Sequence, residues 1–142
     1  MDQTTPLIRF SDTDIESLER ATLDAVAPAC VEQCDGWLIP LEETTIGRAK
    51  SAVPLRHDNI DIADIIAIER RYLARGLRAA FRIADVVGLA PVHGELRRLG
   101  YTPQQPTLFL TGKVDAMRAI CHSHPATVSA FPTPAWSQVY LS

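Results

Sequence analysis

Apolar positions near the start of the chain recur at the spacing of one helical face. Ile15 and Leu18 lie three residues apart, and further apolar residues continue this pattern through residue 26. Ser11 or Asp12 stands just before the pattern, where a short polar side chain can accept a hydrogen bond from the first free backbone N–H groups. Pro28 cannot continue a helix. We therefore predict a helix that begins at Ser11 or Asp12 and ends before Pro28.

Two short segments after this helix have the composition of strands. Residues 34–41 (CDGWLIPL) are mostly apolar, and Pro40 is typical of an edge position or a bulge. Residues 48–55 (RAKSAVPL) alternate in part between charged and apolar side chains, and residues 42–47 between them favour a turn. The pattern predicts a hairpin of these two strands.

The strongest helical signal in the chain covers residues 62–75. Asn59 or Asp61 can cap its start, and Gly76 is the expected stop because glycine adopts the left-handed conformation that ends many helices. The predicted apolar face is broad and contains Ile62, Ile65, Ile66, Ile68, Tyr72 and Leu73. We expect such a face to cover a sheet.

The rest of the chain alternates between strand-like and helix-like segments. In order, the pattern predicts a strand over 79–84, a helix over 92–99 closed by Gly100, a buried strand over 107–111, a helix over 113–121 and an extended segment over 127–141. A helix, a hairpin and then alternating helices and strands favour an α+β fold with a sheet flanked by helices.

Composition and charge exclude several classes of protein. A chain of 142 residues with 46% hydrophobic and 22% charged residues has the length and composition of one globular domain. Its net charge is −3, so it has no broad basic field for nucleic acid or an acidic membrane. The first ten residues lack a signal-peptide pattern, and no apolar run reaches the ~18–20 residues that span a bilayer. With three cysteines, an odd number, we expect a soluble, reduced, cytoplasmic domain without nucleic-acid or membrane partners.

A set of spaced residues carries a further signal: Trp37, Arg48, Ser51, Pro54, Glu69, Tyr72, Gly76-Leu77, Phe81-Arg82 and Gly100-Tyr101. Together with the order of elements over about residues 37–110, this set resembles the GNAT superfamily of acyl-CoA N-acyltransferases. It is closest to the N-terminal GNAT-like half of bacterial two-domain acetyltransferases. The resemblance implies one GNAT-like domain over residues 1–142 with a mixed, largely antiparallel sheet, a core over about 11–111 and a tail over 112–142. It also implies acetyl-CoA as the cofactor of the family and a second GNAT domain as a partner.

The loop that holds the cofactor in that superfamily has no clear counterpart here. There, a Gln/Arg-x-x-Gly-x-Gly/Ala loop grips the pyrophosphate, whereas the corresponding residues 55–62 read LRHDNIDI and include no glycine. Asp58 and Asp61 add negative charge at this position, and Arg56 offsets it only in part. We therefore expect that this chain alone does not bind acetyl-CoA. The alternative is a divergent enzyme in which Arg56 and the helix start hold a CoA phosphate.

Glu69 and Tyr72 are the candidate catalytic residues. They lie three positions apart on the predicted helix, so their side chains can share a face. In an acyltransferase, a carboxylate could deprotonate the attacking amine and a tyrosine could protonate the leaving thiolate. The alternative is structural, with a packing tyrosine and a glutamate that pairs with Arg70, Arg71 or Arg75.

Arg48, Lys50 and Ser51 are, with Arg56, the candidate substrate- or cofactor-binding residues. On a strand, Arg48 and Lys50 would share one face, and Ser51 would point to the other. Such a face could hold an anionic substrate or a phosphate. The alternative is a solvated strand face without a ligand.

Cys30 and Cys34, together with residues 121–124 (CHSH), could supply zinc ligands, since thiolates and imidazoles suit tetrahedral zinc. Their spacing matches no zinc finger or ribbon, and free cysteines commonly act as small buried hydrophobes. We expect no metal site.

Three functions follow from these observations. The first is a non-catalytic half of an acetyl-CoA-dependent N-acetyltransferase, which shapes the substrate cleft. The second is the divergent stand-alone N-acetyltransferase that uses its own cofactor site. The third is a non-enzymatic homodimeric interaction domain, since the apolar group near the C-terminus favours self-association or docking. That group contains Trp136, Val139, Tyr140 and Leu141.

Overall fold

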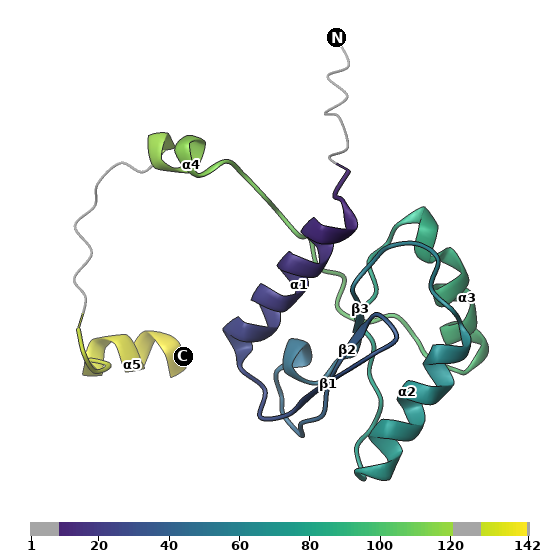
Figure 1. The fold of residues 1–142 in the computed structure, drawn as a ribbon. Helices are drawn as coiled ribbons and strands as arrows, with labels where there is room; N and C mark the ends of the chain where they lie inside the picture. The colour runs from purple at the N-terminus through teal and green to yellow at the C-terminus, as the bar shows by residue number, and fades with distance from the viewer. Residues whose placement is uncertain (1–8, 121–128, 142) are drawn as a thin grey trace. The chain divides into compact units, whose positions relative to one another are not determined.

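The computed structural model of the chain describes residues 9–120 and 129–141. The chain divides into two compact units, Met1–Gln104 and Gln105–Ser142. Within the first unit, helices accompany a three-stranded antiparallel sheet (Figure 1). The predicted α+β class is therefore confirmed.

Helix α1 (Asp12–Val26) begins where its capping residues predict. The Ser11 hydroxyl accepts a hydrogen bond from the backbone N–H of Asp14 at 3.2 Å, and the Asp14 carboxylate accepts one from the backbone N–H of Ser11 at 3.0 Å. This reciprocal pair satisfies two N–H groups that a helix start leaves free. At the other end, Ala27 adopts a left-handed conformation (φ 44°) directly before Pro28. The predicted start and end of this helix are both confirmed.

The sheet consists of β1 (Val31–Cys34), β2 (Trp37–Pro40) and β3 (Val53–Pro54), in that order. Asp35 and Gly36 connect β1 to β2 with φ values of 49° and 81°, the left-handed pair of a tight two-residue hairpin turn. The strand predicted over residues 34–41 is present as β2, but its predicted start at Cys34 is wrong. The Asp-Gly pair reverses the chain inside the predicted range. A tight hairpin therefore forms between β1 and β2, ahead of the predicted pairing of β2 with the next strand.

The strand predicted for residues 48–55 is present only near its C-terminal end. Gly47–Ala49 forms a short 3₁₀ helix, η1, and the Ser51 hydroxyl donates to the Gly47 carbonyl at 2.7 Å. This local bond gives the backbone an alternative to a strand ladder. The start predicted for the strand is wrong, but its antiparallel pairing with the preceding strand is confirmed, with Val53 opposite Leu38.

Helices α2 (Ala63–Ala74) and α3 (Ala90–Arg98) both end at a glycine in the left-handed conformation. Gly76 has a φ of 69° and Gly100 a φ of 90°. The backbone N–H groups of Gly76 and Leu77 donate back to the last turn of α2 at 2.9 Å each, which is the Schellman pattern. Both predicted helices and both glycine stops are confirmed, although α3 begins two residues earlier than predicted, after the 3₁₀ turn η2 (Val87–Leu89).

Residues 79–84 run beside the sheet, where the sequence predicts a strand. The backbone N–H of Ala52 donates to the carbonyl of Ala80, and that of Arg82 donates to the carbonyl of Ala52, each at 2.8 Å. These two bonds form an isolated parallel bridge between Ala52 and Phe81. The predicted strand is thus reduced to one bridge. Because this bridge is parallel and the three strands of the sheet are antiparallel, the first unit contains both kinds of pairing.

The core of the first unit lies on both faces of β2, whose four residues are all buried. The larger cluster contains Trp37, Ile39, Leu41, Ala52, Ile65, Ile68, Tyr72, Leu89, Val92 and Leu96. Figure 1 shows α2 and α3 on that side of the sheet and α1 on the other. The smaller cluster contains Leu38, Val53 and Leu55. A strand covered on both faces has a continuous apolar run, as the sequence of β2 does.

The second unit contains α4 (Val114–Ile120) and α5 (Pro134–Leu141). Over the residues that the structure describes, α4 confirms the helix predicted from residue 113. The extended conformation predicted up to residue 141 is wrong, because α5 is helical. Pro134 stands at the first position of this helix, where its missing N–H is not needed and its fixed φ suits a helix.

The buried strand predicted over residues 107–111 is also wrong. The structure assigns no strand there, and Leu108 and Leu110 are 87% and 85% exposed. Strand propensity alone does not form a strand, since its backbone groups need a partner. No helix among the described residues is long and apolar enough to cross a membrane.

Replacement of Ile65 by alanine tests the packing of α2. Ile65 is fully buried, so Ile65→Ala leaves a cavity, and we expect the free energy of unfolding to fall by about 2–5 kcal/mol. Leu73→Ala is the matched control on the same helix, because Leu73 is 75% exposed; we expect a change within about 0.5 kcal/mol. Urea unfolding followed by circular dichroism measures both. Equal losses in the two variants would contradict the packing of this helix.

Candidate functional site

Glu69 accepts a hydrogen bond from a tyrosine, but the donor is Tyr101 and not the predicted Tyr72. The Tyr101 hydroxyl donates a hydrogen bond to Glu69 Oε1 at 2.6 Å, a short distance typical of a charged acceptor. Both residues are half-buried. Burial raises the pKa of Tyr101, and the bond to Glu69 raises it further because a phenolate would face a carboxylate. Tyr101 therefore remains a neutral hydrogen-bond donor over the physiological pH range.

Tyr101 also belongs to a row of three aromatic rings. It meets Phe81 edge-on with ring centroids 5.3 Å apart, and Phe81 meets Trp37 edge-on at 6.1 Å. Trp37 is fully buried, and its indole N–H donates to Asp64 Oδ2 at 3.3 Å. The row thus links the Glu69–Tyr101 pair to the first turn of α2.

Tyr72 is a core residue. Its exposed fraction is 1%, and its hydroxyl donates to the carbonyl of Lys50 at 3.0 Å. Burial raises the pKa of Tyr72 well above the ordinary range. Because Tyr72 is buried and its proton is bonded to the Lys50 carbonyl, that proton has no route to a ligand without opening the core. The structure therefore does not bring Glu69 and Tyr72 together as an acid–base pair.

The candidate binding residues Arg48, Lys50 and Ser51 do not share a strand. Arg48 is exposed within η1, Lys50 follows the end of η1, and the Ser51 hydroxyl is bonded to the Gly47 carbonyl. Lys50 contributes its backbone carbonyl to the packing of Tyr72. The alternating strand face on which an anion-binding role depended is not formed.

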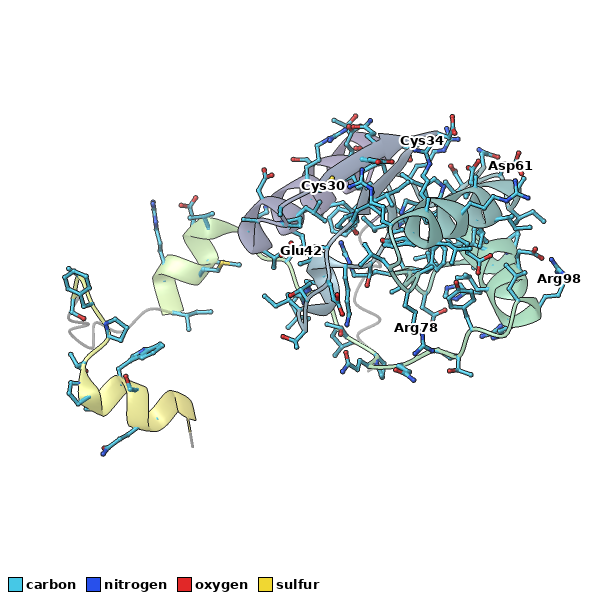
Figure 2. The ribbon with its side chains drawn as sticks, turned by 90° about the horizontal axis from the view of Figure 1, so that it is seen from below. Cys30, Cys34, Glu42, Asp61, Arg78 and Arg98 are labelled. Atoms are coloured by element: carbon cyan, nitrogen blue, oxygen red, sulfur yellow. The ribbon has the colours of Figure 1, made fainter. Side chains whose placement is uncertain are left out.

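The resemblance would place a cofactor phosphate at the start of α2. The backbone N–H groups there are already hydrogen-bonded within the chain. The backbone N–H of Ala63 donates to Asp61 Oδ1 at 2.9 Å. The N–H groups of Asp64 and Ile65 donate to the carbonyls of Asp61 and Ile62 at 3.1 and 3.2 Å. A phosphate binds a helix start through free N–H groups. Here, three of those groups already have acceptors. Ile62 stands at the N-cap without a side-chain cap bond, and the side chain of Asp61 just before it (labelled in Figure 2) accepts from Ala63.

Arg56 does not extend freely toward this helix. Its Nη2 donates to the backbone carbonyl of Asn59 at 3.1 Å, within the same loop. Asn59 itself lies in the left-handed region, with a φ of 50°. Asparagine tolerates this conformation better than most residues, so the loop returns toward α2 without a glycine.

An open hollow of about 610 Å³ lies beside the start of α2. Its lining contains Asp12, Glu16, Gln33, Asp35, Gly36, Leu55, Arg56, Asn59, Asp61 and Asp64. Five of the lining residues carry a carboxylate and one carries a guanidinium, and the Glu16 carboxylate is also paired with Arg20 at 2.7 Å. Burial raises the pKa of Asp64, and the bond from Trp37 opposes that effect. The net charge of this acidic hollow repels an anion such as pyrophosphate and favours a cation.

Cys30 and Cys34, both labelled in Figure 2, each contact an arginine at the C-terminal end of α2; Arg71 belongs to the helix and Arg75 follows it directly. Arg75 Nη1 donates to Cys30 Sγ at 3.5 Å, and Arg71 Nη2 donates to Cys34 Sγ at 3.2 Å. Glu32 forms ion pairs with both arginines, at 2.8 Å to Arg71 and 2.9 Å to Arg75. Partly exposed pairs of this kind contribute little to stability. Both arginines thus form ion pairs with Glu32 on β1 and not with Glu69, the candidate catalytic glutamate.

The thiol of Cys34 is poorly suited to a metal. The thiol of Cys34 donates to Asp35 Oδ2 at 2.8 Å, and this bond raises the pKa of Cys34, which favours the thiol over the thiolate that binds metals. Among the described residues, no group of three or more His, Cys, Asp or Glu side chains is arranged to hold a metal ion. Residues 121–124, the other candidate ligands, lie outside the described residues.

Residues 12–142 match a protein family described as "Probable histone acetyltransferase Rv0428c C-terminal". The match covers most of the chain, so the chain belongs to this family, which is acetyltransferase-related by its description. That description names a C-terminal region, and it lends no support to the N-terminal placement that the resemblance implies. No curated protein matches significantly. No solved structure matches significantly either.

Two features of the site were missed by sequence reasoning. Tyr101 is 32 positions from Glu69, and the Gly100-Tyr101 motif marks a helix end without indicating a spatial neighbour. The acidic hollow draws its carboxylates from α1, the β1–β2 turn and the start of α2. Its only sequence signal was the negative charge of the loop that contains Asp58 and Asp61.

Glu69→Gln tests the effect of the carboxylate on Tyr101. Loss of the negative charge stabilises the phenolate, so we expect the pKa of Tyr101 to fall, although burial still holds it above the ordinary value. The Cζ signal of Tyr101, followed by NMR as the pH rises, measures this change. Glu95→Gln is the matched control, because Glu95 pairs with Arg98 on α3. A Tyr101 titration that is the same in wild type and Glu69→Gln would contradict the contact.

Proposed function

We propose that the chain is a GNAT-like domain of an acetyl-CoA-dependent N-acetyltransferase. In this proposal it shapes the acceptor side of the substrate cleft, and another domain holds the cofactor. The family to which the chain belongs carries the name of a probable histone acetyltransferase. The antiparallel strands, α2 and the parallel bridge from Ala52 to Phe81 follow the order of elements that resembles a GNAT domain. Because a fold does not determine an activity, the argument rests on the site.

The observation that carries this proposal is the occupied start of α2. A pyrophosphate there would have to displace the Asp61 carboxylate from the N–H of Ala63. It would also enter the field of the acidic hollow, where Arg56 is bonded to its own loop. Loss of a hydrogen bond and repulsion between like charges both oppose the binding of acetyl-CoA at this helix.

The charge of the acidic hollow suits a cationic acceptor. The name of the family refers to histones, which are basic proteins. Because Glu16 is paired with Arg20, four other lining carboxylates outnumber the Arg56 guanidinium, and they would attract a basic segment and raise its local concentration. The chain would thus contribute to recognition of the acceptor amine without taking part in the transfer of the acyl group.

A second candidate, the divergent stand-alone N-acetyltransferase, is favoured by the Glu69–Tyr101 pair. This half-buried carboxylate and phenol have the residue types that could deprotonate an amine and protonate a thiolate. Such an enzyme requires acetyl-CoA to bind this chain, and the acidic hollow opposes that. Titration with the cofactor therefore separates the two candidates.

Isothermal titration with acetyl-CoA is the first test. We expect no binding by the wild-type chain at millimolar ligand, because the N–H groups at the start of α2 are occupied. Arg56→Ala is the matched variant, and we expect it to behave like wild type. Micromolar binding that Arg56→Ala weakens would overturn the proposal in favour of the divergent enzyme.

Titration with a lysine-rich peptide tests the acceptor side. We expect weak binding that decreases as salt is added, and a loss of about fivefold for each carboxylate neutralised, the equivalent of ~1 kcal/mol for a close pair in water. Asp61→Asn and Asp64→Asn are suitable because asparagine keeps an oxygen for the helix cap and for the Trp37 bond. Asp115→Asn on α4 is the control and should leave the affinity unchanged. An absence of peptide binding, or equal losses in all three variants, would contradict an acceptor role.

A further inference from the structure

Arg20 of α1 binds two residues that line the acidic hollow. Its Nε and Nη2 both donate to Glu16 Oε1, at 2.8 and 2.7 Å, and Nη2 also donates to Gln33 Oε1 at 2.7 Å. Glu16 and Gln33 are lining residues of the hollow, and Arg20 is not. A guanidinium of the chain itself is therefore bound to one carboxylate and one amide of the proposed acceptor site.

The two acceptors of Arg20 come from different elements. Glu16 lies one turn earlier on α1, and Gln33 lies on β1. Because side chains alternate between the two faces of a strand, Gln33 reaches α1 while Glu32 pairs with Arg71 of α2 on the other face. A planar guanidinium has several donors in fixed directions and suits two acceptors at once, whereas an ammonium group is a compact point charge. The pair of acceptors is thus better suited to an arginine than to a lysine.

The contact of Arg20 with Glu16 is one that another cation can replace. The two side chains are 41% and 45% exposed, so water and solutes reach the ion pair. Exposed pairs four residues apart on a helix add little to stability. An external guanidinium could form the same hydrogen bonds and would also be attracted by the other carboxylates of the hollow. Exchange of Arg20 for such a group therefore costs little.

We propose that Glu16 and Gln33 form a subsite for an arginine side chain of the acceptor, and that Arg20 occupies this subsite until the acceptor displaces it. This inference rests on the proposed function and makes its acceptor more specific, as a basic segment that carries an arginine. Arg20 is then an internal competitor of that segment. Because it holds the subsite in the free chain, its removal strengthens binding of the acceptor.

Titration of the full chain with an arginine-rich peptide at low salt tests the competition. We expect Arg20→Ala to bind the peptide about twofold more tightly than wild type, the effect of removing one exposed ion pair on a helix. Arg98→Ala is the matched control, because Arg98 pairs with Glu95 on α3 and its removal changes the net charge by the same amount; we expect it to bind like wild type. Alanine favours a helix, and far-UV circular dichroism verifies that both variants are folded.

Methylguanidinium tests the subsite without an acceptor peptide. In Arg20→Ala this ion can bind where the guanidinium of Arg20 was, and the side-chain amide signals of Gln33, followed by NMR, report its binding. We expect saturable shifts in Arg20→Ala with methylguanidinium and much smaller ones with methylammonium. We also expect much smaller shifts in wild type, where Arg20 holds the subsite, and in the double variant Arg20→Ala/Glu16→Gln, which lacks the carboxylate charge.

The two experiments separate the subsite from the proposed function. Equal effects of Arg20→Ala and Arg98→Ala on peptide binding, or Gln33 signals that respond alike to methylguanidinium and methylammonium, would overturn the subsite and leave the proposed function standing. A selective response to methylguanidinium in Arg20→Ala, with no binding of any basic peptide, would support the subsite and contradict the acceptor role.

Discussion

The packing of α2 across β2 is the interaction on which the rest of the first unit depends. Trp37 on β2 and Tyr72 on α2 are both buried, and the Tyr72 hydroxyl is bonded to a backbone carbonyl of the loop before β3. Each large apolar side chain removed from water contributes about 1.5–3 kcal/mol, so this contact holds the helix in place against the strand. Because α2 packs in this position, Asp64 can accept a hydrogen bond from the indole of Trp37, and Glu69 can accept one from Tyr101.

The same packing determines the electrostatics beside the helix. It brings the start of α2 next to carboxylates from α1 and from the β1–β2 turn, which together form the acidic hollow. A helix start normally attracts anions through its dipole and free N–H groups. In this chain, Asp61 uses one of those groups and adds a negative charge of its own. Because occupied donors and like charge act in the same direction, this helix is better suited to exclude a pyrophosphate than to bind one.

Local signals in the sequence were sufficient to predict the helices of the first unit. They were insufficient to predict the strands of the sheet and the contacts of the site. The cap at Ser11 and the stop at Gly76 act within a few residues, so the sequence pattern locates them closely. The strand prediction failed at Asp35 because an Asp-Gly turn divides an otherwise continuous apolar stretch. The pairing of Glu69 with Tyr101 depends on how α2 and the end of α3 pack together, and no short-range pattern encodes that contact. Helical spacing instead suggested Tyr72, the nearest tyrosine on the same helix.

The most direct measurement of the central claim is an amide NMR titration of the chain with CoA, read at the N–H signals of Ala63, Asp64 and Ile65. These are the groups that would bind a pyrophosphate at the start of α2, and all three are already bonded within the chain. We predict that their signals stay in place at millimolar CoA. Large, saturable shifts at all three, absent from the spectrum of Arg56→Ala, would show that the helix opens to bind the cofactor and would contradict the claim.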